Sequence, residues 1–220
     1  MRRRLLPPVL GAGLLLLAAC GSSGSDSAAT TTTTAKPLTA ADRRIGQAAL
    51  LRVADAPGYQ QVSPQTSVLA DLADTGEPAC AAYVNGQPHR LGTGRAAGLQ
   101  RGATIVDSST ALYADAAAAQ AETALFRAPA MTGCLKGVSS SAGATIDVTP
   151  VPLDGLGDEA VGYRIARAPS TDASTVIEIF VVRVGRIVIS VTVTGPAADA
   201  AEIERTALAK AVDRVRAAGG

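Results

Sequence analysis

The sequence is poor in the residue types that most often carry chemistry. Among 220 residues it has one histidine, His89, no tryptophan and three cysteines. A single histidine leaves few general bases that titrate near neutral pH, and no Gly-x-Ser-x-Gly elbow accompanies it. We interpret His89 as a solvated loop residue, expect no catalytic residue, and rank a hydrolase with a dispersed site as the weakest hypothesis.

Metal and phosphate motifs are also missing. Cysteine and histidine are too few and wrongly spaced for the usual four ligands of zinc. Asp154, Asp158 and Glu159 lie beside glycines, but the twelve-residue calcium-loop pattern is absent, so a turn leading into a strand is expected there. The glycine-rich segment 92–98 departs from phosphate-loop spacing and is interpreted as a flexible turn. We expect no metal and no cofactor.

Aromatic residues and excess charge are scarce as well. Aromatics make up 3% of the chain, which argues against a sugar-binding platform of stacked rings. Without the first 19 residues, Lys+Arg falls from 20 to 17 against 19 Asp+Glu, a net charge of −2, so no nucleic-acid partner is expected. The remaining composition, 47% hydrophobic and 18% charged, is that of a globular protein.

The N-terminal segment has the order of an export signal. Three arginines, residues 2–4, precede an apolar stretch from Leu5 to Leu17, and two alanines then precede Cys20. A transmembrane anchor is the alternative, but the stretch is interrupted by prolines and glycines and is shorter than the roughly 18 to 20 residues that a spanning helix needs. We therefore predict a signal peptide over residues 1–19.

The residues Leu17-Ala18-Ala19-Cys20 resemble the lipobox of bacterial lipoproteins. The resemblance implies that the Cys20 thiol receives a diacylglyceryl group and that Cys20 becomes the first residue after cleavage. Two or three acyl chains give a lasting anchor, because each buried methylene contributes about 0.8 kcal/mol. We expect a lipid-anchored protein on the extracytoplasmic face of the cell membrane. A core cysteine near a secretory cleavage site is the alternative.

The other two cysteines, Cys80 and Cys134, form an even pair in a compartment where thiols readily oxidise. This favours one disulfide, which would stabilise the fold by about 4 kcal/mol in the chain-entropy model. Residues 20–38 are rich in glycine, serine and threonine and are expected to form a flexible tether. The folded domain is then expected to cover residues 39–220.

Hydrophobic periodicity predicts an α+β domain with a mainly antiparallel sheet packed by helices. Thr39 and Asp115 are candidate N-caps of two helices. Residues 62–97 are interpreted as mostly loop, because Pro, Gly, Asp and Asn recur there. The expected helices are 39–53, 115–126 and 198–216, and the expected strands are 99–112, 145–151, 158–166, 175–184 and 187–193.

The strongest local signal is a hairpin over residues 175–193, with Gly185-Arg186 at its turn. In its second strand the apolar residues share one face: Ile187, Ile189, Val191 and Val193. Glu178 and Arg183 interrupt the first strand at positions of opposite parity, so they lie on different faces and each needs another partner if buried. Either could line a cleft, although exposure on an edge strand is the more common explanation.

Three segments resemble actinobacterial extracytoplasmic lipoproteins with a PknH-type extracellular sensor domain. They are residues 49–59, Leu156-Gly157-Asp158-Glu159-Ala160, and Val182-Arg183-Val184-Gly185 before a hydrophobic strand. The resemblance implies a PsbP-like sandwich and a structural role for Cys80 and Cys134. Our leading hypothesis is a noncatalytic binding or sensory module for an envelope ligand or protein. A lipid or glycolipid carrier is the second hypothesis, and it would require a deep apolar cavity.

Overall fold

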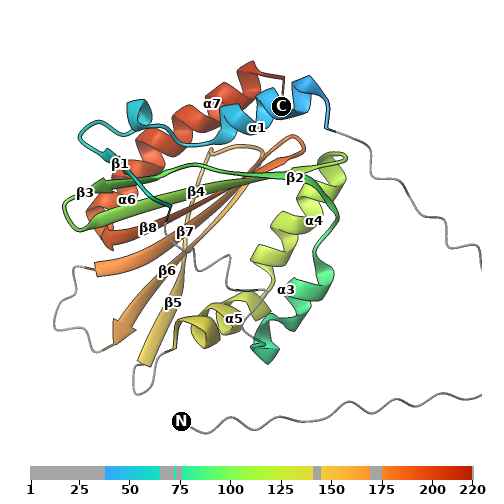
Figure 1. Cartoon of the computed structure of the whole chain (residues 1–220). Coiled ribbons are helices and arrows are strands. Elements are labelled where there is room, and N and C mark those ends of the chain that lie inside the picture. Colours follow the sequence, from blue (N-terminus) through green and yellow to red (C-terminus); the bar gives the residue numbers. More distant parts are fainter. Residues whose placement is uncertain (1–37, 65–71, 73–75, 141–144, 169–174, 220) are drawn as a thin grey trace, which may run out of the picture. The chain divides into compact units, whose positions relative to one another are not determined.

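A computed structural model describes residues 38–64, 72, 76–140, 145–168 and 175–219 (Figure 1). The predicted signal peptide, Cys20 and the tether to residue 37 lie outside these residues. Within the described ranges, every helix is too short or too polar to span a membrane.

One antiparallel sheet of eight strands organises the described part of the chain, in the order β1-β3-β4-β8-β7-β6-β5, with β2 also paired to β4. β2 and β3 lie end to end along the same edge of β4, because β2 pairs with its second half and β3 with its first. The strands are β1 (Gln60–Val62), β2 (Arg90–Arg95), β3 (Gly98–Arg101), β4 (Thr104–Tyr113), β5 (Thr145–Val151), β6 (Glu159–Ala168), β7 (Thr175–Val184) and β8 (Ile187–Pro196).

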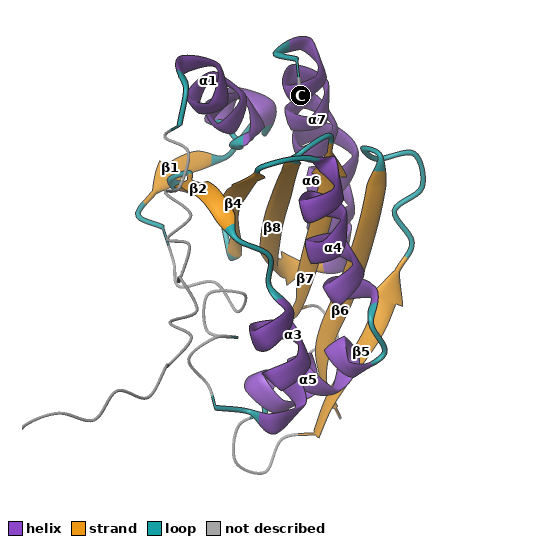
Figure 2. Ribbon diagram, turned by 90° about the vertical axis from the view of Figure 1, so that its right-hand side faces the viewer, coloured by secondary structure: helices purple, strands orange, loops and turns teal. Residues whose placement is uncertain are grey.

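Helices cover both faces of this sheet (Figures 1 and 2). On the first face α1, α6 and α7 pack against the apolar residues of β7 and β8. On the second face α4 packs on β6, β7 and β8, and α5 packs on β5 and β6. This layered arrangement confirms the predicted α+β class. The helices are α1 (Ala40–Ala49), α3 (Ala81–Gly86), α4 (Ala116–Arg127), α5 (Ala130–Ser139), α6 (Ala197–Ile203) and α7 (Ala209–Ala217), with shorter turns η1 (Val53–Asp55), η2 (Pro78–Cys80) and η3 (Glu204–Leu208).

The central hairpin forms as the alternating pattern predicts. Gly185 adopts a φ of 57° in the turn between β7 and β8, a conformation that glycine adopts without steric cost. The predicted apolar face of β8 is buried against the helices of the first face, together with residues of α6, η3 and α7. Ile203, Leu208, Val212 and Val215 supply the predicted helical stripe that covers it.

Both predicted helix caps are present. The Thr39 side chain accepts a hydrogen bond from the Asp42 backbone N–H, and the Asp42 carboxylate accepts one from the Thr39 N–H, which makes a capping box. The Asp115 carboxylate accepts a hydrogen bond from the Ala118 N–H at the start of α4. Each cap joins residues only three positions apart, so the start of each helix can be predicted from the sequence alone.

Three predictions about local structure are wrong. The described residues of the segment 62–97 contain η2, α3 and β2 rather than mostly loop, and Gly92 and Gly94 of the glycine-rich segment belong to strand β2 rather than to a turn. Glu178 is not exposed on an edge, because β7 lies inside the sheet and Glu178 is only 1% exposed. Its partner is Arg164 on β6, whose Nε lies 2.6 Å from Glu178 Oε1.

Candidate functional site

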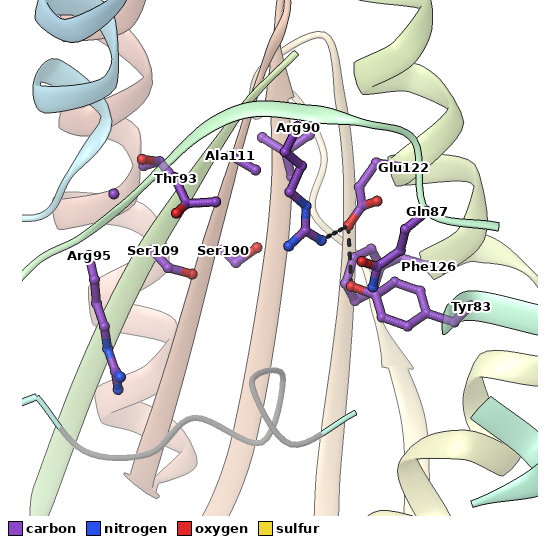
Figure 3. A pocket seen from close by; sticks show the side chains of 13 residues that line it. Tyr83, Gln87, Arg90, Thr93, Arg95, Ser109, Ala111, Glu122, Phe126 and Ser190 are labelled. Atoms are coloured by element: carbon purple, nitrogen blue, oxygen red, sulfur yellow. Dashed lines mark hydrogen bonds and ion pairs between the residues drawn. The ribbon is translucent and has the colours of Figure 1, made fainter. Parts of the chain in front are cut away.

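A pocket of about 490 Å³ opens on the second face of the sheet (Figure 3). Its floor is formed by small side chains of adjacent strands, with Ser109 and Ala111 on β4 opposite Ser190 and Val188 on β8. These small side chains leave the sheet surface hollow beside α4. The other lining residues are Tyr83, Gln87, Arg90, Thr93, Gly94, Arg95, Thr110, Glu122 and Phe126.

A buried carboxylate stands in the wall of this pocket. Glu122 on α4 is 2% exposed, and its Oε1 lies 2.7 Å from Arg90 Nη2. The Tyr83 hydroxyl, on α3, donates a hydrogen bond of 3.2 Å to the same oxygen. Arg90 also donates from Nε to the Tyr113 hydroxyl at 3.2 Å. The second oxygen, Glu122 Oε2, is buried and has no hydrogen-bond partner among the described residues.

The ionisation states of this cluster follow from its burial and its charges. Burial, reinforced by the neighbouring Glu122 carboxylate, raises the pKa of Tyr83 and of Tyr113 above the ordinary value for tyrosine. Burial by itself would lower the pKa of Arg90, but Glu122 and Tyr113 raise it overall. Both phenols therefore stay protonated at neutral pH, with the Tyr83 hydroxyl donating to Glu122 and the Tyr113 hydroxyl accepting from Arg90, and Arg90 keeps its charge.

The helix α4 positions Glu122 because of its periodicity. The buried residues of α4 include Ala119, Glu122, Thr123 and Phe126, which have the spacing of an apolar helix face. Phe126 packs on Tyr83 with ring centroids 4.9 Å apart, so the aromatic contact fixes α3 beside the carboxylate. Burying a carboxylate without hydrogen-bond partners lowers the stability of the fold. Arg90 and Tyr83 are the partners of Glu122.

The predicted cysteine pair supports the same wall. Cys80 and Cys134 form a disulfide in the structure, with their Cα atoms 4.6 Å apart. Cys80 immediately precedes α3, and Cys134 lies on α5. Because Tyr83 follows Cys80 by three residues on α3, the disulfide ties the helix that carries this hydrogen-bond donor to α5.

The histidine and the acidic cluster considered at the sequence level do not line the pocket, whereas the glycine-rich segment 92–98 does, through Gly94. His89 is exposed in the loop between α3 and β2. Asp158 accepts hydrogen bonds from the Gly185 N–H and from Arg183, and Glu159 lies 3.4 Å from Arg183, so both acids and Arg183 serve the turn where β6 begins. In the described residues no group of three or more histidine, cysteine or acidic side chains is arranged to hold a metal ion.

Sequence reasoning missed the residues that line the pocket. Arg90 follows His89 in a segment interpreted as loop, and Ser109 and Ser190 look like the ordinary polar positions of alternating strands. One signal was available: Glu122 occupies a core-facing position of an alanine-rich helix. A charged residue at such a position predicts a buried partner or a cavity.

Comparison with known proteins gives a partial likeness. No family model matches the chain, and no curated protein matches it. Among solved structures, the extracellular domain of PknH from Mycobacterium tuberculosis is 16% identical; the match covers 83% of this chain and 99% of that chain, with a TM-score of 0.42. What this chain binds therefore has to be inferred from its own pocket.

Proposed function

We propose that this chain is a noncatalytic ligand-binding module, held by a lipid on Cys20 at the extracytoplasmic face of a cell membrane. The observation that carries the binding proposal is the pocket on the second face of the sheet, whose lining combines apolar side chains with the polar groups of Arg90, Arg95, Ser109 and Ser190. Pockets that combine apolar surface with a few placed polar groups are typical ligand sites.

The build of the pocket supports binding over catalysis. Its polar groups are held by one another, because Glu122, Arg90, Tyr83 and Tyr113 form a chain of hydrogen bonds. His89, the single histidine, does not line the pocket. A rigid, preformed set of donors costs little ordering when a ligand binds.

The proposed location depends on the sequence and on the disulfide. The lipobox-like residues before Cys20 support the anchor, and the Cys80–Cys134 disulfide is of a kind that persists in oxidising compartments. A lipid or glycolipid carrier is less well supported, because the pocket wall carries Arg90, Arg95 and Glu122 rather than apolar side chains alone. Packing acyl chains against these charged side chains would remove the charges from water without giving them partners, which costs free energy.

The binding proposal can be tested by filling the pocket. Ser190 lies on the floor, and a Ser190→Phe substitution would occupy the space above β8. The full chain is purified from cells that export and lipidate it. Small molecules bound to the purified protein are then extracted with solvent and identified by mass spectrometry. We expect a small molecule that co-purifies with the wild-type chain, is recovered unchanged after incubation, and is missing from Ser190→Phe.

A matched control places the same ring elsewhere on the sheet. Thr149 is an exposed residue of strand β5, so Thr149→Phe adds an equal apolar area away from the pocket. We expect Thr149→Phe to retain the co-purifying molecule. Equal retention by Ser190→Phe would contradict the site, and conversion of the molecule into a product would contradict the noncatalytic function.

A further inference from the structure

We propose that this pocket binds an oxyanion of a small organic ligand, a carboxylate or phosphate group, between Arg90 and Arg95 and above the hydroxyls of Ser109 and Ser190. The inference rests on the proposed binding function and names the chemistry of its ligand. It is carried by the positions of the hydrogen-bond donors that surround the hollow.

The register of the sheet aligns the first set of donors. Arg95 on β2 lies opposite Ser109 on β4, and Ser109 lies opposite Ser190 on β8, so the three residues form a row across adjacent strands. Figure 3 shows Arg95 on one side of the two serines and Arg90 on the other. Hydroxyl groups and guanidinium groups are the donors that most often bind carboxylate and phosphate oxygens.

Arg90 is held in position to donate. Its Nε and Nη2 are directed to Tyr113 and Glu122, and the dashed lines of Figure 3 mark the contacts around the Glu122 carboxylate. In the same view the other terminal nitrogen of Arg90 points toward Ser190. The ion pair with Glu122 therefore fixes the guanidinium plane and leaves one edge directed to the hollow, which is the preorganised fork that an oxyanion needs.

Arg95 completes the opposite side. Its side chain is 42% exposed, and its Nη2 lies 3.7 Å from Asp107 Oδ1, which is within ion-pair range but beyond hydrogen-bond distance. The guanidinium can therefore turn toward a bound oxyanion without breaking a hydrogen bond to Asp107. Asp107 itself is 7% exposed and does not line the pocket.

A cationic ligand fits the same surface less well. The acceptor that lacks a partner among the described residues, Glu122 Oε2, points away from Arg90 and toward the side of Gln87 in Figure 3. In the same view Arg90 lies between Glu122 and the two serines, and all four residues line the pocket. Phe126, Val188 and Ala111 give the pocket an apolar part, which indicates an organic body on the anion rather than an inorganic ion alone.

The test measures binding of defined anions to the full chain by isothermal titration calorimetry at low salt. The probes are acetate, inorganic phosphate, glycerol 3-phosphate and dihexanoyl phosphatidylglycerol, with glycerol and ethanolamine as a neutral and a cationic probe. We expect the anions to bind, the two organic phosphates more tightly than inorganic phosphate. Arg95→Gln should weaken binding by about tenfold to a hundredfold, the range for a lost charge-assisted contact.

Two further variants keep the result interpretable. Arg44→Gln removes the same charge from an exposed position of α1 outside the pocket, and we expect it to leave anion affinity unchanged. Arg90→Lys keeps the charge beside Glu122 but loses the planar fork, so it should weaken binding while the unfolding transition stays cooperative. Tighter binding of dihexanoyl phosphatidylglycerol than of glycerol 3-phosphate would assign the phosphate to a lipid headgroup, and equal affinity to a free small molecule.

Three outcomes would overturn the assignment. They are unchanged anion affinity in Arg95→Gln, an equal loss in Arg44→Gln, and binding of ethanolamine in place of the anions. These outcomes are separate from failure of the proposed function. If Ser190→Phe loses a co-purifying neutral molecule that Arg95→Gln retains, ligand binding stands and the oxyanion is wrong.

Discussion

Tyr83 and Glu122 are 39 positions apart in the sequence, yet the Tyr83 hydroxyl donates a hydrogen bond of 3.2 Å to the Glu122 carboxylate. The contact joins α3 to α4, the two helices that form one wall of the pocket. A hydrogen bond to a buried charge is worth more than one between neutral groups, because the charge has little water to replace it. The phenolic oxygen therefore adds a hydrogen bond to the wall, beside the ring contact of Tyr83 with Phe126 and the ion pair of Arg90 with Glu122.

Removing that oxygen should destabilise the fold measurably. Tyr83→Phe keeps the ring that packs on Phe126 but takes one donor from Glu122, so we expect the free energy of unfolding to fall by about 1.5 to 3 kcal/mol. Urea denaturation followed by circular dichroism measures the change. A loss below about 0.5 kcal/mol would show that Arg90 alone satisfies the carboxylate.

The disulfide should make a larger contribution to stability. Cys80 and Cys134 are separated by 54 positions, and closing a loop of this length stabilises by about 4 kcal/mol in the chain-entropy model. We expect reductant to lower the midpoint of thermal unfolding of the wild-type chain. The double variant Cys80→Ser, Cys134→Ser should already have the lower midpoint and should not respond to reductant. An unchanged wild-type midpoint after complete reduction would contradict this.

The N-cap of α1 predicts a pH dependence of stability. The backbone N–H of Thr39, its hydroxyl and the Arg186 guanidinium lower the pKa of Asp42 from 3.8 to about 2. A carboxyl whose pKa is lower in the folded state stabilises the fold above its unfolded pKa, and this stabilisation is lost as pH falls through the folded value. We therefore expect wild type to exceed Asp42→Asn in stability above pH 4, with the difference falling steeply as the pH drops to about 2 and vanishing below it.

The control for this prediction is a second aspartate that does not cap a helix. Asp213 is exposed on α7, so Asp213→Asn changes the net charge equally. Because Asp213 is exposed, Asp213→Asn should change the free energy of unfolding less than Asp42→Asn does at neutral pH. Chemical denaturation at each pH gives both curves.

The proposed anchor predicts the fate of the chain in a cell. Cys20→Ala removes the thiol that would carry the lipid, so we expect the protein to leave the membrane fraction. Fractionation followed by a high-salt wash measures this, because salt screens electrostatic adhesion and leaves a lipid anchor in place. Retention of Cys20→Ala in the washed membranes would contradict the anchor.

The elements that the sequence predicts correctly are those with local signals. Asp115 caps α4 through a residue three positions away, and the alternation in β8 depends on neighbours two positions apart. The strand β2 was missed because Gly92 and Gly94 have low strand propensity. Space beside Gly94 is small, because a Cβ there would lie 2.9 Å from the Thr110 hydroxyl. A Cβ on Gly92 would meet only the end of the Leu38 side chain, at 2.7 Å, which can move aside.

The pocket could not be predicted in the same way, because no local signal defines it. Arg95 lies in one row with Ser190 only because of the registers of two strand pairs, and Arg90 contacts Glu122 only once α4 has packed on the sheet. The pairing of Arg164 with Glu178 likewise follows from the β6–β7 register, where the two residues lie opposite each other. The sequence predicts that Glu178 needs a partner if it is buried. The order of the strands in the sheet shows that this partner is Arg164.

The position of α7 sets the order in which the fold can be completed. Val212 and Val215 lie on α7, which packs on β7 and on α1, the first of the described helices. A nascent chain that lacks α7 exposes that apolar face, so native packing waits until synthesis has passed Val215. A chain ended before Ala209 would carry an uncovered sheet face and would aggregate or be degraded, even though every residue of the pocket would be present.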